Sequence, residues 1–120
     1  MSDAVDLGKR AMRCRSFQWK AGMIRITPEA IHVDHPANLD PAIGMIKASL
    51  GDRCNRLILD WSGDEQGWYV CAWNSNGDLL IPEYDNSAWH PSLTRAVFAA
   101  LVAVDTGYNS CSCSESGNKK

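Results

Sequence analysis

The alternation of apolar and polar residues in the middle of the chain predicts two antiparallel hairpins. Residues 23–33 contain two short β-branched segments on either side of a turn, in which Pro28 suits the first central position. Residues 56–61 and 67–73 predict two longer strands joined by a polar turn. An Asn-Gly pair then leads the chain into a third strand at 79–81, so these strands form a meander.

Apolar residues recur at helical spacing in three segments. Residues 3–14 predict a short helix, and residues 40–50 predict a second one with Asp40 as its N-cap. Residues 91–104 predict a third helix with Pro91 at its first position. This last helix is apolar around most of its circumference. We therefore expect it to be buried on more than one side, either between the sheet and another helix or at a subunit contact.

These elements predict an α+β fold, in which two or three helices pack on a mostly antiparallel sheet of four to six strands. With 120 residues and 13.2 kDa, the chain is long enough for one domain and too short for two. We expect residues 1–105 to form a single globular domain. Residues 106–120 are mostly polar and bury too little surface to offset their conformational entropy, so we expect a disordered tail.

The net charge of −2 conceals a division between two parts of the chain. Residues 1–25 have a net charge of +4, whereas residues 26–105 have a net charge of −7. The residues that we expect to form a basic patch are Lys9, Arg10, Arg13, Arg15 and Lys20. We expect this segment to lie across the acidic body or, if it stands away from it, to offer a partner a surface of both signs. The neighbouring acidity argues against nucleic acid as that partner, because it repels phosphate.

The beginning of the chain and its longest apolar run indicate a cytoplasmic protein. The first six residues include two acids and no apolar run, which is unlike a secretory signal. The longest apolar stretch has nine residues, fewer than half of those that a bilayer span requires. We therefore expect no membrane contact.

The five cysteines are expected to be reduced. Cys14, Cys54 and Cys71 lie in segments that we predict in or beside the core, where a thiol behaves as a small hydrophobe. Cys111 and Cys113 could form half of a metal site or a redox pair. A closed zinc site needs four ligands, however, so we expect two exposed thiols.

Five tryptophans are many for this length. Strand alternation places Trp61 and Trp68 toward the core, and it places Trp73 on the other face of the meander. That face belongs to the core if a helix covers it and forms an aromatic platform if it is open. Trp19 and Trp89 lie in loop-like segments and are better candidates for a surface contact.

The three histidines do not have the spacing of a metal site. His32 and His35 converge only if the chain bends between them, because residues three apart on a strand face opposite sides. No arrangement typical of a nucleophile with its base is present either, so we predict no catalytic residue, no metal ligand and no cofactor. A pocket lined by Trp73, Tyr84 and His90 is the alternative that would suit a small enzyme or ligand-binding protein.

Three segments resemble the motifs of one family. They are Phe17-Gln18-Trp19-Lys20-Ala21-Gly22-Met23, Asp40-Pro41-Ala42-Ile43-Gly44, and Ser92-Leu93-Thr94-Arg95-Ala96 before alanine-rich sequence. Over about residues 14–104 the chain resembles short uncharacterised phage and prophage proteins, in which F-x-W-x-x-G-M, D-P-A-x-x-G and an alanine-rich helix enclose a small sheet. It departs from them at Gly44, which comes one residue early. The resemblance implies an α-β-α sandwich-like accessory protein and carries over no reaction.

The sequence thus predicts a non-enzymatic accessory protein that binds another protein, which could be a host factor. The candidate contact residues are Trp19, Trp73, Tyr84, Trp89 and His90, together with the basic patch. A homo-oligomer formed through the helix at residues 91–104 is a further expectation.

Overall fold

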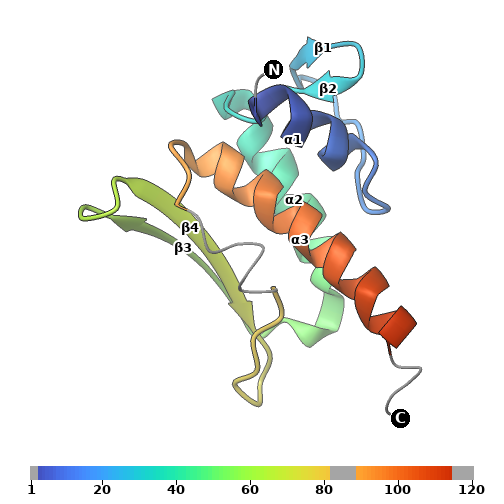
Figure 1. Cartoon of the computed structure of the whole chain (residues 1–120), viewed down its shortest axis with the longest axis vertical. Helices are drawn as coiled ribbons and strands as arrows, with labels where there is room; N and C mark the ends of the chain where they lie inside the picture. The colour runs from blue at the N-terminus through green and yellow to red at the C-terminus, as the bar shows by residue number, and fades with distance from the viewer. Residues whose placement is uncertain (1–2, 82–88, 115–120) are drawn as a thin grey trace.

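The structure, a computed structural model, describes residues 3–81 and 89–114 (Figure 1). The helices are α1 (Asp3–Met12), η1 (Pro36–Asn38), α2 (Leu39–Leu50), η2 (Gly51–Arg53) and α3 (Leu93–Ser114), of which η1 and η2 are 3₁₀ turns. The strands are β1 (Arg25–Thr27), β2 (Ala30–Ile31), β3 (Arg56–Ser62) and β4 (Gly67–Trp73). The α+β class is therefore confirmed. No helix in these two ranges is long and apolar enough to cross a membrane.

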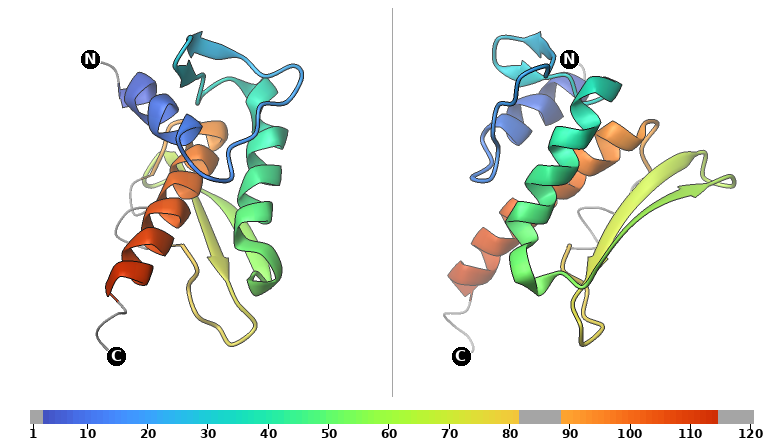
Figure 2. Two further views of the ribbon diagram at one scale, coloured as in Figure 1. Left: turned by 90° about the vertical axis from the view of Figure 1, so that its right-hand side faces the viewer. Right: turned by 180° about the vertical axis from the view of Figure 1, so that it is seen from behind.

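Helix α3 forms the centre of the molecule. It contacts α1 and α2 on one side and β4 on the other (Figures 1 and 2). Every residue from Ala96 to Val104 is at most 9% exposed. Of the two alternatives for this apolar helix, burial within the chain is the one that the structure shows. Its residues 96–104 are thus almost wholly covered by other parts of the same chain.

The ends of α3 differ from those that the sequence predicts. The helix begins at Leu93 instead of Pro91, because the hydroxyl of Ser92 caps it by accepting a hydrogen bond from the Arg95 amide at 3.1 Å. It also continues past residue 104 to Ser114. No proline interrupts that stretch, and each added residue gains a backbone hydrogen bond. Helical backbone thus extends into the expected tail, of which residues 115–120 lie outside the described ranges.

Close contacts shape the middle of α1 and the start of α2. In α1, a side chain at Gly8 would clash with the carbonyl oxygen of Ile31, so glycine allows the helix to lie directly against β2. Helix α2 begins at Leu39, with Asn38 in the N-cap position that we predicted for Asp40. The reason is that η1 leads straight into α2 and moves its start toward the N-terminus.

Asn38 fastens the first hairpin to the start of α2. It is fully buried, and its Nδ2 donates hydrogen bonds of 2.8 Å to the carbonyl oxygens of Ile24 and His32. Its Oδ1 accepts a third, also 2.8 Å, from the amide of Ile24. One amide side chain therefore satisfies three main-chain groups at the base of the hairpin.

The β3–β4 hairpin is regular, and pairs without a break from Arg56 opposite Trp73 to Ser62 opposite Gly67. The third strand of the predicted meander is reduced to an isolated bridge between Trp73 and Leu79 on the other edge of β4. The two hairpins form separate two-stranded sheets in the described ranges, so the single sheet of four to six strands is not found there. The first hairpin is held by α1 and Asn38, away from β4.

Replacing Asn38 tests how much this clamp stabilises the fold. Asn38→Ala removes three hydrogen bonds and leaves the Ile24 amide without a partner, while the carbonyl oxygens of Ile24 and His32 keep bonds from the amides of His32 and His35. The variant should lower the free energy of unfolding by about 2–4 kcal/mol. Chemical denaturation measures the change. Asn76→Ala is the matched control, because Asn76 is exposed in a turn and should change stability by less than about 0.5 kcal/mol. Equal effects of the two variants would contradict the role of Asn38.

Candidate protein-binding surface

Three of the four large hydrophobic side chains that are exposed among the described residues lie in one short segment. Trp19 is 46% exposed, and Ile24 and Ile26 are each 38% exposed. The guanidinium of Arg25 lies 4.5 Å from the centre of the Trp19 ring, which is a cation–π contact. With Lys20, these residues make up what we name the Trp19 surface.

Local hydrogen bonds fix the shape of this surface. The amide of Met23 donates to the carbonyl oxygen of Lys20 at 3.2 Å, and the Lys20 amide lies 3.1 Å from the Met23 sulfur. Gly22 has φ of +93°, a conformation that side chains rarely adopt. Because Met23 is buried and Asn38 holds the main chain of Ile24, the exposed side chains project from a braced turn.

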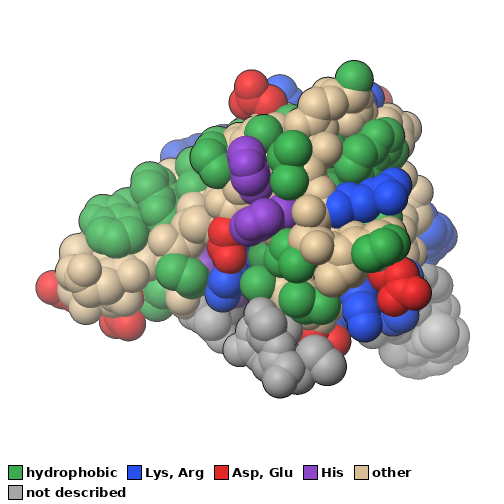
Figure 3. All heavy atoms as spheres, turned by 90° about the horizontal axis from the view of Figure 1, so that it is seen from above, with side chains coloured by type: hydrophobic (Ala, Val, Ile, Leu, Met, Phe, Trp, Pro, Cys, Tyr) green, Lys and Arg blue, Asp and Glu red, His purple; other side chains and the backbone are tan. Residues whose placement is uncertain are grey.

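The charged side chains that accompany the apolar ones on the Trp19 surface are basic. Lys20 and Arg25 are exposed, as is Arg13 in the preceding loop. Figure 3, which views the molecule from above, shows hydrophobic side chains interspersed with basic, acidic and histidine side chains. Such a surface suits a partner that offers apolar side chains together with carboxylates.

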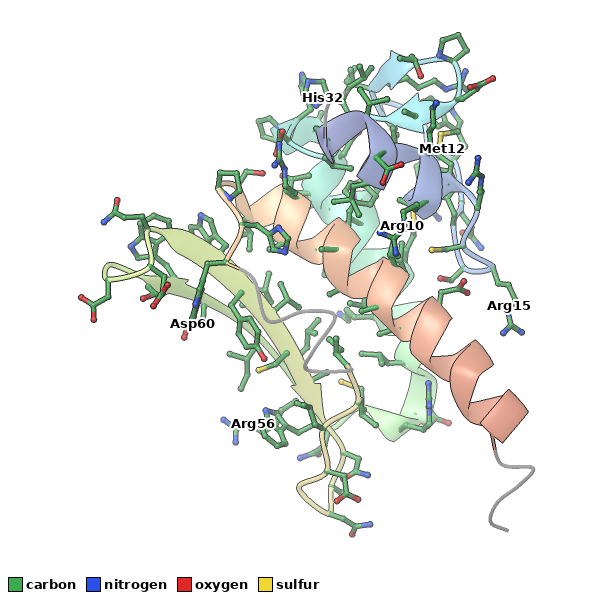
Figure 4. The ribbon with its side chains drawn as sticks, viewed as in Figure 1. Arg10, Met12, Arg15, His32, Arg56 and Asp60 are labelled. Carbon is green, nitrogen blue, oxygen red and sulfur yellow. The ribbon has the colours of Figure 1, made fainter. Side chains whose placement is uncertain are left out.

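The basic N-terminal segment lies against the acidic body largely through apolar contacts. Helix α1 packs on β2 and α3, and Leu7 and Ala11 from α1 join the core. After α1, Arg15 Nε lies 3.8 Å from Asp105 Oδ1, so the segment also forms an ion pair with an acid of the body. Asp60, on the β3–β4 hairpin, lies far from Arg15 (Figure 4). Apolar packing, together with this ion pair, therefore positions the segment.

The remaining predicted contact residues are distributed along β4. Trp89 lies outside the helices and strands and packs on Tyr69 with ring centres 5.2 Å apart, so it is half-buried against the sheet. His90 exchanges two backbone hydrogen bonds with Trp68. Trp73 lies five positions further along β4, about 17 Å away at the rise of a strand.

The alternative pocket is therefore not assembled from these residues. Trp73 and His90 lie at opposite ends of β4, and Tyr84 lies outside the described ranges. The structure brings Trp19 together with Lys20, and it leaves Trp73 apart from both.

The prediction that Trp61 belongs to the core is wrong. Trp61 is 46% exposed, and its ring centre lies 5.4 Å from that of the half-buried Trp68. Alternation gives its face correctly, since Leu57 and Leu59 on the same face pack against the core. Trp61 stands nearer the tip of the hairpin, where burial of that face ends.

Sequence reasoning missed an ion-pair cluster at the start of α3. The carboxylate of Asp34 accepts hydrogen bonds of 2.8 Å from the Ser92 hydroxyl and from Arg95 Nε, and another from the second guanidinium nitrogen. Burial alone would raise the pKa of Asp34, but these bonds and the charge of Arg95 outweigh it and hold the pKa below 3.8. Ser92 thus caps a helix and bonds a carboxylate, so it is not arranged as a nucleophile.

The histidines beside this cluster do not form a metal site. The chain bends after β2, so the rings of His32 and His35 do meet, with centres 5.5 Å apart. Burial and, next, the charge of Arg95 lower the pKa of His90, whose Nε2 has no hydrogen-bond partner among the described residues. In the part of the chain that the structure describes, no three His, Cys, Asp or Glu side chains gather around a possible ion.

A small polar cleft also escaped the sequence analysis. Its volume is about 270 Å³, and it is lined by Arg15, Ser16, Ser49, Arg53, Val104 and Asp105. Both guanidinium groups already have partners, because Arg15 pairs with Asp105 and Arg53 donates to the carbonyl oxygens of Leu50 and Ser49. Nearby, burial and then the charge of Asp105 raise the pKa of Cys14 to about 12, so it stays a thiol.

The Asp34 cluster predicts a dependence of stability on pH. Because the pKa of Asp34 is lower in the folded chain, its carboxylate stabilises the fold above pH 3.8 and loses this effect as the pH falls through the lower folded value. Asp34→Ala should therefore lower the free energy of unfolding by about 1–3 kcal/mol at neutral pH, with a smaller loss in strong acid. Denaturation at several pH values measures both. Asp64→Ala, at the exposed hairpin turn, should have little effect at any pH; a loss for Asp34→Ala that persists undiminished in acid would contradict the assignment.

Comparison of the chain with protein-family models, with curated proteins and with solved structures finds no match. The resemblance to phage and prophage proteins therefore stays a prediction. Among the surfaces described above, the Trp19 surface is the one that combines exposed aromatic, aliphatic and basic groups.

Proposed function

We propose that the chain is a non-enzymatic accessory protein that binds another protein through the Trp19 surface. The observation that carries the proposal is Trp19 itself, which is nearly half exposed and lies against the guanidinium of Arg25. Two more exposed apolar side chains, Ile24 and Ile26, follow in the same short segment. Large apolar side chains that cost free energy in water are typical of contact surfaces.

The composition of the surface supports tight contact. Tryptophan and arginine are the residue types most enriched at binding hot spots, and here Trp19 and Arg25 touch each other. The turn that carries them is braced by Met23 and Asn38, so little conformational freedom is left to lose on binding. The partner chemistry that fits is an apolar patch with carboxylates, because Lys20 and Arg25 are both basic and exposed.

An accessory role in a phage or prophage, in the cytoplasm of a bacterial host, is part of the same proposal. What supports it is the order of sequence motifs, of which Phe17 to Met23 forms the turn of the Trp19 surface. A small enzyme or ligand-binding protein has less support, since Trp73 and His90 lie at different ends of β4.

Binding measurements on Trp19→Ala test the proposal. A protein captured from bacterial lysate by the wild-type chain is purified and titrated against wild type and variants. Trp19→Ala should raise the dissociation constant by about thirtyfold, because truncation of a hot-spot tryptophan costs about 2 kcal/mol. Circular dichroism checks that each variant is folded.

The control is Trp61→Ala, since Trp61 is as exposed as Trp19 but lies on the other hairpin. Its dissociation constant should match that of wild type. The proposal is wrong if no protein is retained by wild type, or if Trp61→Ala weakens binding and Trp19→Ala does not.

A further inference from the structure

The edges of the β3–β4 sheet are occupied unequally. At the edge of β4 that faces away from β3, Trp68 exchanges two backbone hydrogen bonds with His90, and Ala72 accepts one from the amide of Leu80. In residues 3–81 and 89–114, no segment pairs with the outer edge of β3. A seven-residue strand is thus bonded on one side only.

The register shows which backbone groups of β3 point outward. Backbone groups alternate in direction along a strand, and Trp68 and Ala72 of β4 point away from β3. The intervening β4 residues therefore bond to β3, where they lie opposite Arg56, Ile58 and Asp60. It follows that the amides and carbonyls of Leu57, Leu59 and Trp61 point to the open edge.

The side chains beside this edge carry one charge of each sign. Arg56 and Asp60 are exposed on the face of β3 that does not pack on the core, with Ile58 midway between them. Figure 4 shows both charged side chains on the outer side of the hairpin, away from the helices. They lie four positions apart, about 13 Å along the strand, so they cannot pair within one chain.

We propose that β3 pairs antiparallel with β3 of a second copy, with the two Ile58 residues facing each other across a two-fold axis. In this register, Arg56 of each chain lies opposite Asp60 of the other. Leu57 of each chain lies opposite Leu59 of the other, and these are the residues whose backbone groups point outward. A shift of two residues in either direction would place a charged residue opposite Ile58, with the ion pairs lost.

A second copy fits this edge better than other occupants. Charged side chains usually protect edge strands from pairing. Here Arg56 and Asp60 would each lie opposite a residue of the other sign on an antiparallel second copy of β3. The pairing creates a four-stranded sheet with order β4-β3-β3-β4, in which both edges of each β3 are bonded. The interface is isologous and closes at two copies, because each β3 has one open edge.

The test is the oligomeric state of the full chain, measured by sedimentation equilibrium over a range of concentrations. Wild type should form a dimer. Asp60→Arg and Arg56→Asp should each raise the dimer dissociation constant by about tenfold or more, because both cross-strand pairs then carry like charges. The double variant Arg56→Asp/Asp60→Arg restores opposite charges and should dimerise like wild type. Both positions are exposed, so circular dichroism should show folded chains.

Two control variants separate this proposal from the others. Glu65→Arg reverses an exposed acid in the hairpin turn, outside the pairing, and should leave the dimer intact. Trp19→Ala should also leave it intact, which keeps the test independent of the Trp19 surface. The proposal is overturned if wild type stays monomeric at millimolar concentration, if single reversals leave the dimer unchanged, or if the double variant is as weak as either single one.

Discussion

The burial of α3 is the constraint on which the other elements depend. Its residues 96–104 are apolar on all sides and almost wholly buried, so the chain must cover every face of this helix. Helices α1 and α2 do so on one side and β4 on the other. The hairpins consequently lie on different sides of a helix, and neither can complete the sheet of the other. The surfaces available to a partner are therefore those that this arrangement leaves exposed.

Much of the secondary structure could be predicted because its signals are local. Apolar spacing indicated α2, α3 and both hairpins, with errors of one or two residues at the helix starts and of ten residues at the end of α3. The start of α3 differs because the hydroxyl of Ser92 reaches the Arg95 amide and caps the helix, whereas Pro91 has no hydroxyl. The assembly of the hairpins into one sheet could not be judged in this way. It depends on the contact of Gly8 with Ile31 and on the bonds of Asn38, which join segments distant in sequence.

The residues of the candidate site also differ in whether a local sequence signal predicts their placement. The loop context of Trp19 indicated an exposed side chain, and the structure agrees. The exposure of Trp61 could not be predicted, because alternation gives the face of a strand but not how far the core covers that face. The cluster of Asp34 and Arg95 joins residues 61 positions apart and has no local signal. Basic residues near the N-terminus suggested attraction to the acidic body, and the structure shows one such ion pair, from Arg15 to Asp105, beside the apolar contacts of α1.

The two proposed surfaces have different physical origins and can act together. The Trp19 surface is a braced turn that exposes side chains, whereas the edge of β3 exposes backbone groups. They lie on separate hairpins, so occupation of one leaves the other open. A dimer paired at β3 would carry two Trp19 surfaces held at a fixed separation by a four-stranded sheet. A partner with two matching patches would then gain affinity through effective concentration, with no contact beyond those that a single copy makes.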